Sequence, residues 1–210
     1  NARMNSAKNH SATHLLHFAL RKILGNHVEQ KGSLVNKQYL RFDFSHYAKL
    51  SEEELDKIEK LVNDEIRNGH PLIEERNVPL LLAKEKGAMM LFGEKYGDSV
   101  RTIQFGESIE LCGGTHVNLT SQIGQFRIVS EGSISSGIRR IEAFTGEEAD
   151  FYINQKLTTL KNISDILKQP TDILEAVKSL HLKNSELNKI IEKNRKAVVK
   201  QVKLNILENE

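Results

Sequence analysis

The sequence predicts an α+β fold in which helices pack on an antiparallel sheet, followed by an α-helical C-terminal extension. Segments with apolar residues at helical spacing lie among segments in which apolar and polar residues alternate, and glycine-containing turns separate the alternating segments. Helices and strands interspersed in this way are typical of α+β proteins. From Glu147 onward the sequence has no glycine and only one proline, Pro170, which predicts a final part built of helices alone.

The first part of the chain is predicted to contain two long helices with a strand between them. Apolar residues recur at helical spacing over about 6–24, and a glycine follows. Residues 39–45 alternate apolar and polar side chains, as a half-buried strand does. The second helix begins with a capping-box pattern formed by Ser51 and Glu54 and ends at Gly69.

A short helix over about 78–87 and a run of strands complete the predicted first domain, residues 1–147. The strands are expected at 100–105, 108–112, 125–130 and 138–144. The extension, residues 148–210, is predicted to hold two or three helices, the last over about 184–207. Its apolar residues approximate a helical stripe: Leu180, Leu187, Ile190, Ile191, Val198, Val202 and Ile206. The rest of that helix is polar, so we expect it to pack on another helix or another chain.

Composition limits the classes of protein to consider. The 30 Lys and Arg residues nearly balance the 28 Asp and Glu residues, which neither demands nor excludes a nucleic-acid partner. No apolar run approaches the roughly 20 residues of a membrane span. A single cysteine rules out an internal disulfide framework and favours a reducing, cytoplasmic setting. Without an initiator methionine or a secretory signal, the sequence is expected to be a fragment of a longer chain.

Two histidine-containing pairs share one spacing and predict a metal site. His10 and His14 are four positions apart in the first helix, so both rings lie on one face. Cys112 and His116 repeat that spacing about a hundred residues later. Three imidazoles and one thiolate suit Zn²⁺ better than Ca²⁺ or Mg²⁺. The intervening glycines, residues 113–114, allow a sharp turn in the backbone.

Other interpretations of these residues remain open on spacing alone. His17 continues the His14 face and could replace either helical ligand. A lone cysteine is often a small buried apolar residue. Cys112 could also be a nucleophile paired with His116 or His10, although the sequence shows no third orienting group.

Several long strings resemble the editing domain of alanyl-tRNA synthetase, over residues 3–146 and in that family's order. They are RMNSAKNHSATHLLHFALRKILGNHVEQKGSLV, LRFDFSH, GAMMLFGEKYGDSVR, ELCGGTHV and IGQFRIVSEGSISSGIRRIEAFTG. Freestanding alanyl-tRNA editing proteins and the additional domain of threonyl-tRNA synthetase share the two histidine-containing pairs. The GAMMLFGEKYGD string and the helical tail are most similar to the full synthetase.

The resemblance implies the fold of the synthetase editing domain and the hydrolysis of mischarged Ser-tRNA(Ala) and Gly-tRNA(Ala). It implies one Zn²⁺ per chain, held by His10, His14, Cys112 and His116. The full enzyme would join alanine to tRNA(Ala), with ATP and Mg²⁺ only in an aminoacylation region outside this sequence. A homodimer through the C-terminal helices, or through a further C-terminal domain, is also expected. The alternatives are a freestanding editing protein and a non-catalytic, zinc-stabilised module for tRNA binding or dimerisation.

Four more residues are candidates for contacts with the substrate or with the tRNA. By resemblance, Gln30 is a pocket residue that selects or orients the amino acid; composition alone would make it a solvated loop residue. Thr115 could offer its hydroxyl to a serine side chain or cap the local backbone. Arg139 and Arg140 could bind the 3′ end of the tRNA, or could form surface salt bridges. Alternation along a strand sends these two arginines to opposite faces.

Overall fold

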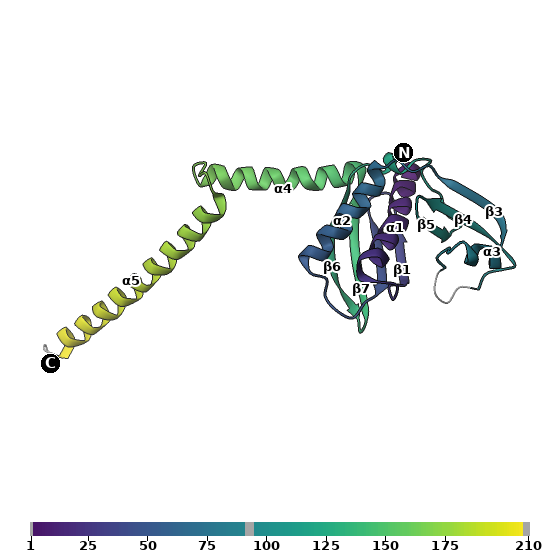
Figure 1. The fold of residues 1–210 in the computed structure, drawn as a ribbon. Helices are drawn as coiled ribbons and strands as arrows, with labels where there is room; N and C mark the ends of the chain where they lie inside the picture. The colour runs from purple at the N-terminus through teal and green to yellow at the C-terminus, as the bar shows by residue number, and fades with distance from the viewer. Residues whose placement is uncertain (1, 91–94, 208–210) are drawn as a thin grey trace. The chain divides into compact units, whose positions relative to one another are not determined.

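The computed structural model describes residues 2–90 and 95–207, which form two compact units (Figure 1). The first unit ends at Ile153 and the second begins at Asn154. The first unit combines helices with antiparallel sheets, and the second is helical. The predicted α+β class with a helical extension is therefore confirmed. Residues 91–94 of the GAMMLFGEKYGD string lie outside the described residues.

A four-stranded antiparallel sheet forms the base of the first unit. Its strands are β1 (Gln30–Val35), β2 (Leu40–Ser45), β7 (Ile138–Thr145) and β6 (Phe126–Ser135), in that order across the sheet. The predicted apolar face of β2 is confirmed, because Leu40, Phe42 and Phe44 are fully buried. Asp43, expected on the solvent side, is also buried, and it forms an ion pair with Arg140 on β7.

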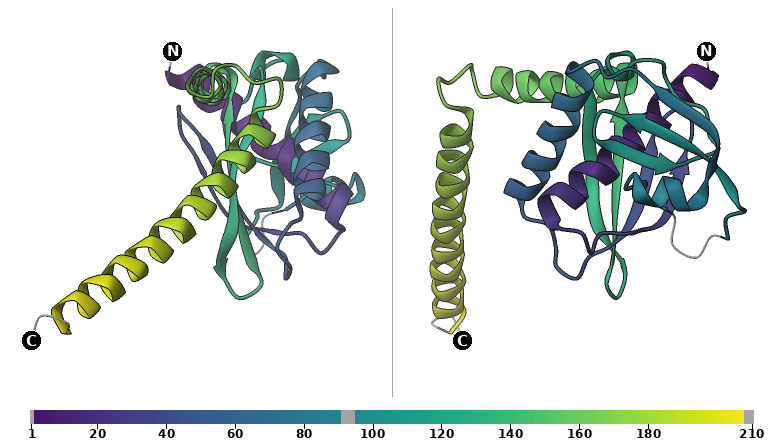
Figure 2. Two further views of the ribbon diagram at one scale, coloured as in Figure 1. Left: turned by 90° about the vertical axis from the view of Figure 1, so that its left-hand side faces the viewer. Right: turned by 45° about the vertical axis from the view of Figure 1, so that its right-hand side comes forward.

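Two helices, α1 (Ala2–Leu24) and α2 (Glu52–Arg67), pack side by side on this sheet (Figures 1 and 2). The middle of α1 is buried on several sides, because β5 of a second sheet also lies against it. This burial includes polar residues. For example, Asn9 donates to the backbone oxygen of Asn36 at 2.8 Å and accepts from the Thr145 hydroxyl at 2.7 Å. These contacts satisfy the buried amide and fix α1 against the sheet.

The capping box predicted at the start of α2 is present. The Ser51 hydroxyl accepts from the backbone N–H of Glu54, and the Glu54 carboxylate accepts from the backbone N–H of Ser51. The helix ends at Arg67, and Gly69 adopts a positive φ of 66° after it. Local sequence therefore defines both ends of α2.

A second, three-stranded sheet makes the wall that carries Cys112. Its strands are β3 (Ile73–Pro79), β4 (Ser99–Phe105) and β5 (Ser108–Leu111), all antiparallel, and the short helix α3 (Leu80–Glu85) follows β3. The expectation of a single sheet was thus wrong. The helix predicted over about 78–87 is confirmed with shorter bounds, because residues up to Pro79 belong to β3. Strands β1 and β3 were not predicted. Both are edge strands with mostly exposed side chains, so they lack the apolar alternation that marks a strand.

The helices α4 (Gly146–Ile166) and α5 (Ile173–Leu207) follow. The last helix begins at Ile173 rather than near residue 184, because Asp172 caps it by accepting from the backbone N–H of Glu175. The expected apolar stripe is exposed along α5 at every residue whose side chain is described; that of Ile206 lies outside the described residues. Among the described helices, none is both long and apolar enough to cross a membrane.

Candidate metal centre

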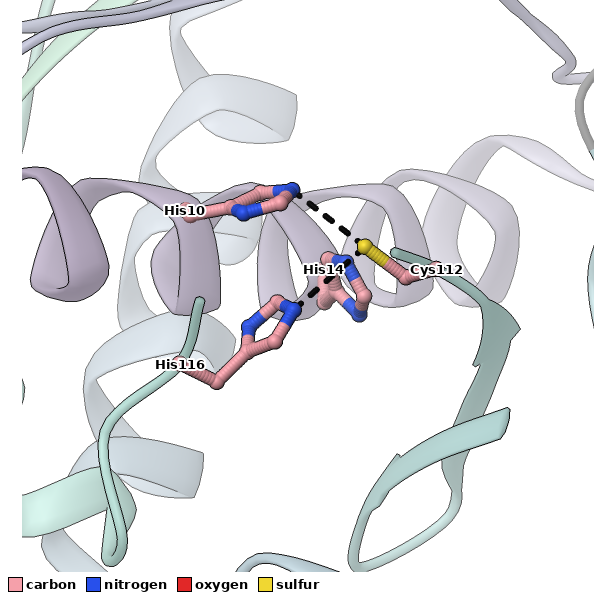
Figure 3. A group of neighbouring side chains, drawn as sticks. All are labelled: His10, His14, Cys112 and His116. Atoms are coloured by element: carbon pink, nitrogen blue, oxygen red, sulfur yellow. Dashed lines mark hydrogen bonds between the residues drawn. The ribbon is translucent and has the colours of Figure 1, made fainter. Parts of the chain in front are cut away.

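Four side chains from distant parts of the sequence converge at one point of the first unit (Figure 3). His10 and His14 project from α1, Cys112 directly follows β5, and His116 lies in the loop beyond it. One potential ligand atom from each residue lies within 4.8 Å of all the others. The two pairs recognised in the sequence therefore form one cluster.

The sulfur of Cys112 is central to the cluster. Its Sγ lies 3.5 Å from Nε2 of His10 and 3.4 Å from Nε2 of His116. Sulfur and nitrogen ligands of a tetrahedral zinc ion lie about 3.5 Å apart, given the usual bond lengths. Nδ1 of His14 is buried with no hydrogen-bond partner among the described residues, so its lone pair or its proton is unsatisfied. Distances, donor types and this unsatisfied nitrogen fit Zn²⁺.

The loop between Cys112 and His116 is held by an arginine from the neighbouring strand and by a contact within the loop. The guanidinium of Arg101 on β4 donates to the backbone oxygens of Cys112 at 2.8 Å and Gly114 at 2.7 Å. The backbone N–H of Gly114 points to the Cys112 sulfur at 3.4 Å. This last contact favours the thiolate form of cysteine, which is the form that binds metal.

A serine next to His10 positions His116. Ser11 is fully buried, and its hydroxyl lies 3.2 Å from Nδ1 of His116 and accepts from the backbone N–H of Val117 at 3.1 Å. A hydrogen bond to Nδ1 orients the ring and leaves Nε2 directed toward Cys112. Helix α1 therefore supplies two ligands, His10 and His14. Through Ser11 it also orients a third ligand, His116, which lies in the loop after β5.

A buried carboxylate lies behind the helical ligands. Glu110 on β5 is 6% exposed, and its Oε1 lies 3.0 Å from Nδ1 of His17 while its Oε2 lies 3.5 Å from Nε2 of His14. His17 thus contacts Glu110 and does not join the cluster, which removes it as a substitute ligand. Carboxylates that contact metal-binding histidines commonly fix ring orientation.

Burial keeps the histidines of the cluster neutral. It lowers the pKa of His14 well below the usual value, helped by the neighbouring His116 and His10. It also lowers the pKa of His116 to about 3, with further contributions from His10 and Arg101. The pKa of His10 falls for the same main reason, although a hydrogen bond with the Thr115 backbone opposes the fall. Neutral imidazoles have the lone pair that a metal requires.

A cleft of about 640 Å³ opens beside the cluster. The loop lines one part of it with its two glycines, Thr115 and His116. Residues from β3, β4 and the start of α1 line most of the rest. Ligand sites for small molecules commonly have this volume. Thr115 is exposed in this cleft, as a residue that contacts a substrate must be.

The other residues singled out from the sequence lie elsewhere in the first unit. Gln30 is the first residue of β1, where its amide donates to the Ser33 hydroxyl at 3.2 Å, and it is not among the residues lining the cleft. Arg140 forms two hydrogen bonds with Asp43, and Arg139 is paired with Glu131. Both arginines therefore form the salt bridges that the sequence left as their alternative.

Sequence reasoning did not assign roles to Ser11, Glu110 and Arg101. Spacing alone could have suggested two of them. Ser11 lies three positions before His14 on the same helical face, and Glu110 lies two positions before Cys112 in an extended segment. Arg101 carries no such signal, because it reaches the loop only through the pairing of β4 with the chain at Cys112.

Comparison with known proteins gives matches over most of the chain. Residues 100–142 match the family described as the threonyl and alanyl tRNA synthetase second additional domain. An alanine–tRNA ligase of Flavobacterium psychrophilum is 56% identical over 204 residues, which is 97% of this chain and 23% of that protein. Those of Christiangramia forsetii and Cytophaga hutchinsonii are 52% and 50% identical over 201 residues, covering 96% and 93% of this chain and 23% of each protein. The chain thus spans less than a quarter of the length of these relatives.

Proposed function

The chain is homologous to one segment of the alanine–tRNA ligases, and on that premise we propose that it is an editing hydrolase for mischarged tRNA(Ala). The reaction is hydrolysis of the ester in Ser-tRNA(Ala) and Gly-tRNA(Ala). Water adds to the ester carbonyl, the bond from that carbon to the ribose oxygen breaks, and the free amino acid and the tRNA 3′-terminal hydroxyl are released.

One observation carries this proposal. A cluster with the donor set of a zinc site borders an open cleft large enough for an amino acid attached to a nucleotide. A buried cluster without a cleft would support only a structural role. The match of residues 100–142 to a synthetase domain supports aminoacyl-tRNA as the proposed substrate class.

In this proposal His10, His14, Cys112 and His116 bind one Zn²⁺ ion. When bound, the ion supplies Lewis-acid character at the edge of the cleft. Ser11 and Glu110 keep the rings in place, and Arg101 keeps the loop in place. The chain's own contribution is thus a rigid wall against which the ester is held.

The need for such a site follows from the size of the substrates. A pocket that fits alanine admits glycine, and it rejects serine poorly because one hydroxyl adds little volume. A second site can prefer serine by hydrogen-bonding that hydroxyl, since alanine would leave the polar partners unpaired. Thr115, which lines the cleft, is the proposed partner. Gln30 is retained as a proposed selectivity residue that would act through the first strand.

The test pairs metal analysis with a deacylation assay on Ser-tRNA(Ala). We expect about one zinc per chain, hydrolysis by the wild type, and loss of hydrolysis after chelation and in a folded Cys112→Ala variant. Full hydrolysis by metal-free protein would remove zinc from the reaction. Absence of hydrolysis of both Ser-tRNA(Ala) and Gly-tRNA(Ala) by zinc-loaded protein would overturn the proposed function.

A second candidate is a zinc-stabilised RNA-binding module without catalysis. Four protein ligands fill a tetrahedral shell, and this is the pattern of structural zinc sites, whereas catalytic sites keep a position for water or substrate. This candidate predicts that the first unit unfolds when zinc is removed and that the zinc-loaded chain binds tRNA without hydrolysing the ester. The same two measurements therefore separate the candidates.

The wider context is proposed from the relatives as a class. The complete protein would join alanine to tRNA(Ala) with ATP and Mg²⁺ in a region outside this sequence, and it would act in the cytoplasm. The exposed apolar residues of α5 are proposed to contribute to a homodimer.

A further inference from the structure

We propose that the cleft beside the four-ligand cluster binds the phosphodiester backbone at the 3′ end of an RNA strand through Arg3 and Arg76. The inference rests on the proposed function for the nature of the ligand, because the amino acid of an aminoacyl-tRNA is attached to the 3′-terminal nucleotide. It replaces Arg139 and Arg140 as the expected phosphate contacts, since neither of them lines the cleft.

The charge of the cleft supports an anionic ligand. Three arginines and one glutamate are among its lining residues: Arg3, Arg76, Arg101 and Glu74. Arg101 is used internally, because it donates to two backbone oxygens of the metal loop and to Glu74. The other two arginines remain exposed. An excess of cations in a cleft raises the local concentration of an anionic ligand.

Arg76 is directed to the cleft by an irregularity in its strand. The pairing of β3 with β4 shifts register between Glu75 and Val78, and Asn77 in that interval has a positive φ of 57°. A bulge of this kind bends an edge strand and re-aims its side chains, and bulges occur often beside active sites. Arg76 and Asn77 both line the cleft as a result, and the exposed guanidinium of Arg76 pairs with the half-buried carboxylate of Glu74.

Arg3 reaches the cleft from the first turn of α1. It lies seven residues before His10, so it shares a face with that ligand and lies about 10 Å from it along the helix axis. Within the described part of the chain, no hydrogen bond or ion pair involves the Arg3 side chain. The helix thus presents a metal ligand and an available guanidinium on one side, separated by two turns. Arginine is well suited to phosphate oxygens because its planar donors bind them in pairs.

Together these positions indicate how an RNA end lies in the cleft. The ester lies at the cluster, and the terminal nucleotide fills the volume beside Thr115. The phosphates then pass Arg3 on one wall and Arg76 on the other. These contacts carry no base sequence information, so they position the strand and do not select it.

The test measures binding of a short RNA hairpin that has a single-stranded 3′ end and carries no amino acid. The comparison is the same hairpin trimmed to a blunt end. The variants are Arg3→Gln, Arg76→Gln and their combination. The matched control is Arg67→Gln, which removes an exposed arginine that is also paired with a carboxylate, on α2. Each cleft variant is expected to weaken the Kd for the overhanging RNA about tenfold. It should also reduce the salt dependence by about 0.7 in slope, the single-strand value per phosphate contact.

The control should leave the Kd unchanged, and the blunt hairpin should bind all variants equally weakly. The inference is overturned if the double variant binds the overhanging RNA as the wild type does. It is also overturned if the wild type does not distinguish the two hairpins. Failure of the proposed function looks different: Arg3 and Arg76 would still determine binding of the 3′ end, but the zinc-loaded chain would not hydrolyse Ser-tRNA(Ala).

Discussion

The imidazole of His10 fills the space that a side chain on Gly114 would need. A Cβ at Gly114 would overlap Cε1 and Nδ1 of the ring and lie 3.3 Å from Nε2, whereas a Cβ at Gly113 would meet nothing within 4 Å. The two adjacent glycines of the motif therefore differ in role. Gly114 lets the loop approach the helix that carries His10, and Gly113 does not serve that purpose.

Gly114→Ala is predicted to weaken zinc binding about tenfold or more, because the added methyl group displaces the His10 ring from Cys112. Competition with a chromogenic chelator measures the affinity directly, independent of any enzymatic activity. Gly113→Ala is the matched control and should change the affinity by about twofold at most. Equal losses in the two variants would mean that the loop requires glycine for its flexibility rather than for this close approach.

Glu110→Gln is predicted to lower zinc affinity by about 10-fold to 100-fold, the usual effect of removing a group that orients metal-binding histidines. The amide keeps the size of the carboxylate but loses its charge toward His14 and His17. Glu107→Gln on the same hairpin is the control, since Glu107 is exposed and pairs only with Lys22 among the described residues. An unchanged affinity in Glu110→Gln would show that the carboxylate serves only the packing of His17.

Much of the fold could be predicted because its signals are local. The capping box of α2 and the apolar face of β2 depend on residues close in sequence, and both predictions are confirmed. The strands β1 and β3 could not be predicted, because an edge strand is held by backbone hydrogen bonds to its neighbour and needs few apolar side chains. The start of α5 differs from the prediction because the cap at Asp172, and not the apolar stripe, determines where the helix begins.

The candidate site, like the fold, could be predicted from the sequence only where its geometry is local. The spacing of the histidines and the cysteine predicts a cluster, since four-residue steps on a helix and across a tight loop are local geometry. The contacts of Arg101 and the commitment of Arg139 to Glu131 depend on which strands pair, and spacing does not reveal this. Charged residues near a motif therefore cannot be divided into ligand contacts and internal ion pairs before the sheet order is known.

The metal-free protein is predicted to lose stability as the pH falls below about 6.5. Burial lowers the folded-state pKa of His14 and of His116, the latter to about 3, whereas unfolding restores the ordinary value of 6.5. The unfolded chain therefore binds more protons in this window, and the free energy of unfolding decreases as the pH is lowered through it. The slope is at most about 1.4 kcal/mol per pH unit for each histidine.

Urea unfolding of chelator-treated protein, followed by near-ultraviolet circular dichroism between about pH 7 and about pH 5, measures this slope. His116→Asn should make it shallower, because the substituted side chain no longer takes up a proton on unfolding. His181→Asn, on an exposed position of α5, should leave it unchanged. A stability that does not vary over this range would contradict the assignment of neutral, buried imidazoles to the cluster.

Arg139→Gln is predicted to destabilise the first unit by about 3 kcal/mol without changing RNA affinity in the folded state. Arg139 is 9% exposed and donates to Oε1 of Glu131, whereas Oε2 of that carboxylate is buried with no hydrogen-bond partner among the described residues. Removing the guanidinium leaves this charge buried and unpaired, so most of the loss comes from Glu131. Adding Glu131→Gln should therefore restore much of the stability, because two neutral amides can hydrogen-bond to each other. Thermal unfolding and hairpin binding of both variants distinguish this outcome from a direct phosphate contact, which would lower RNA affinity in the single and the double variant alike.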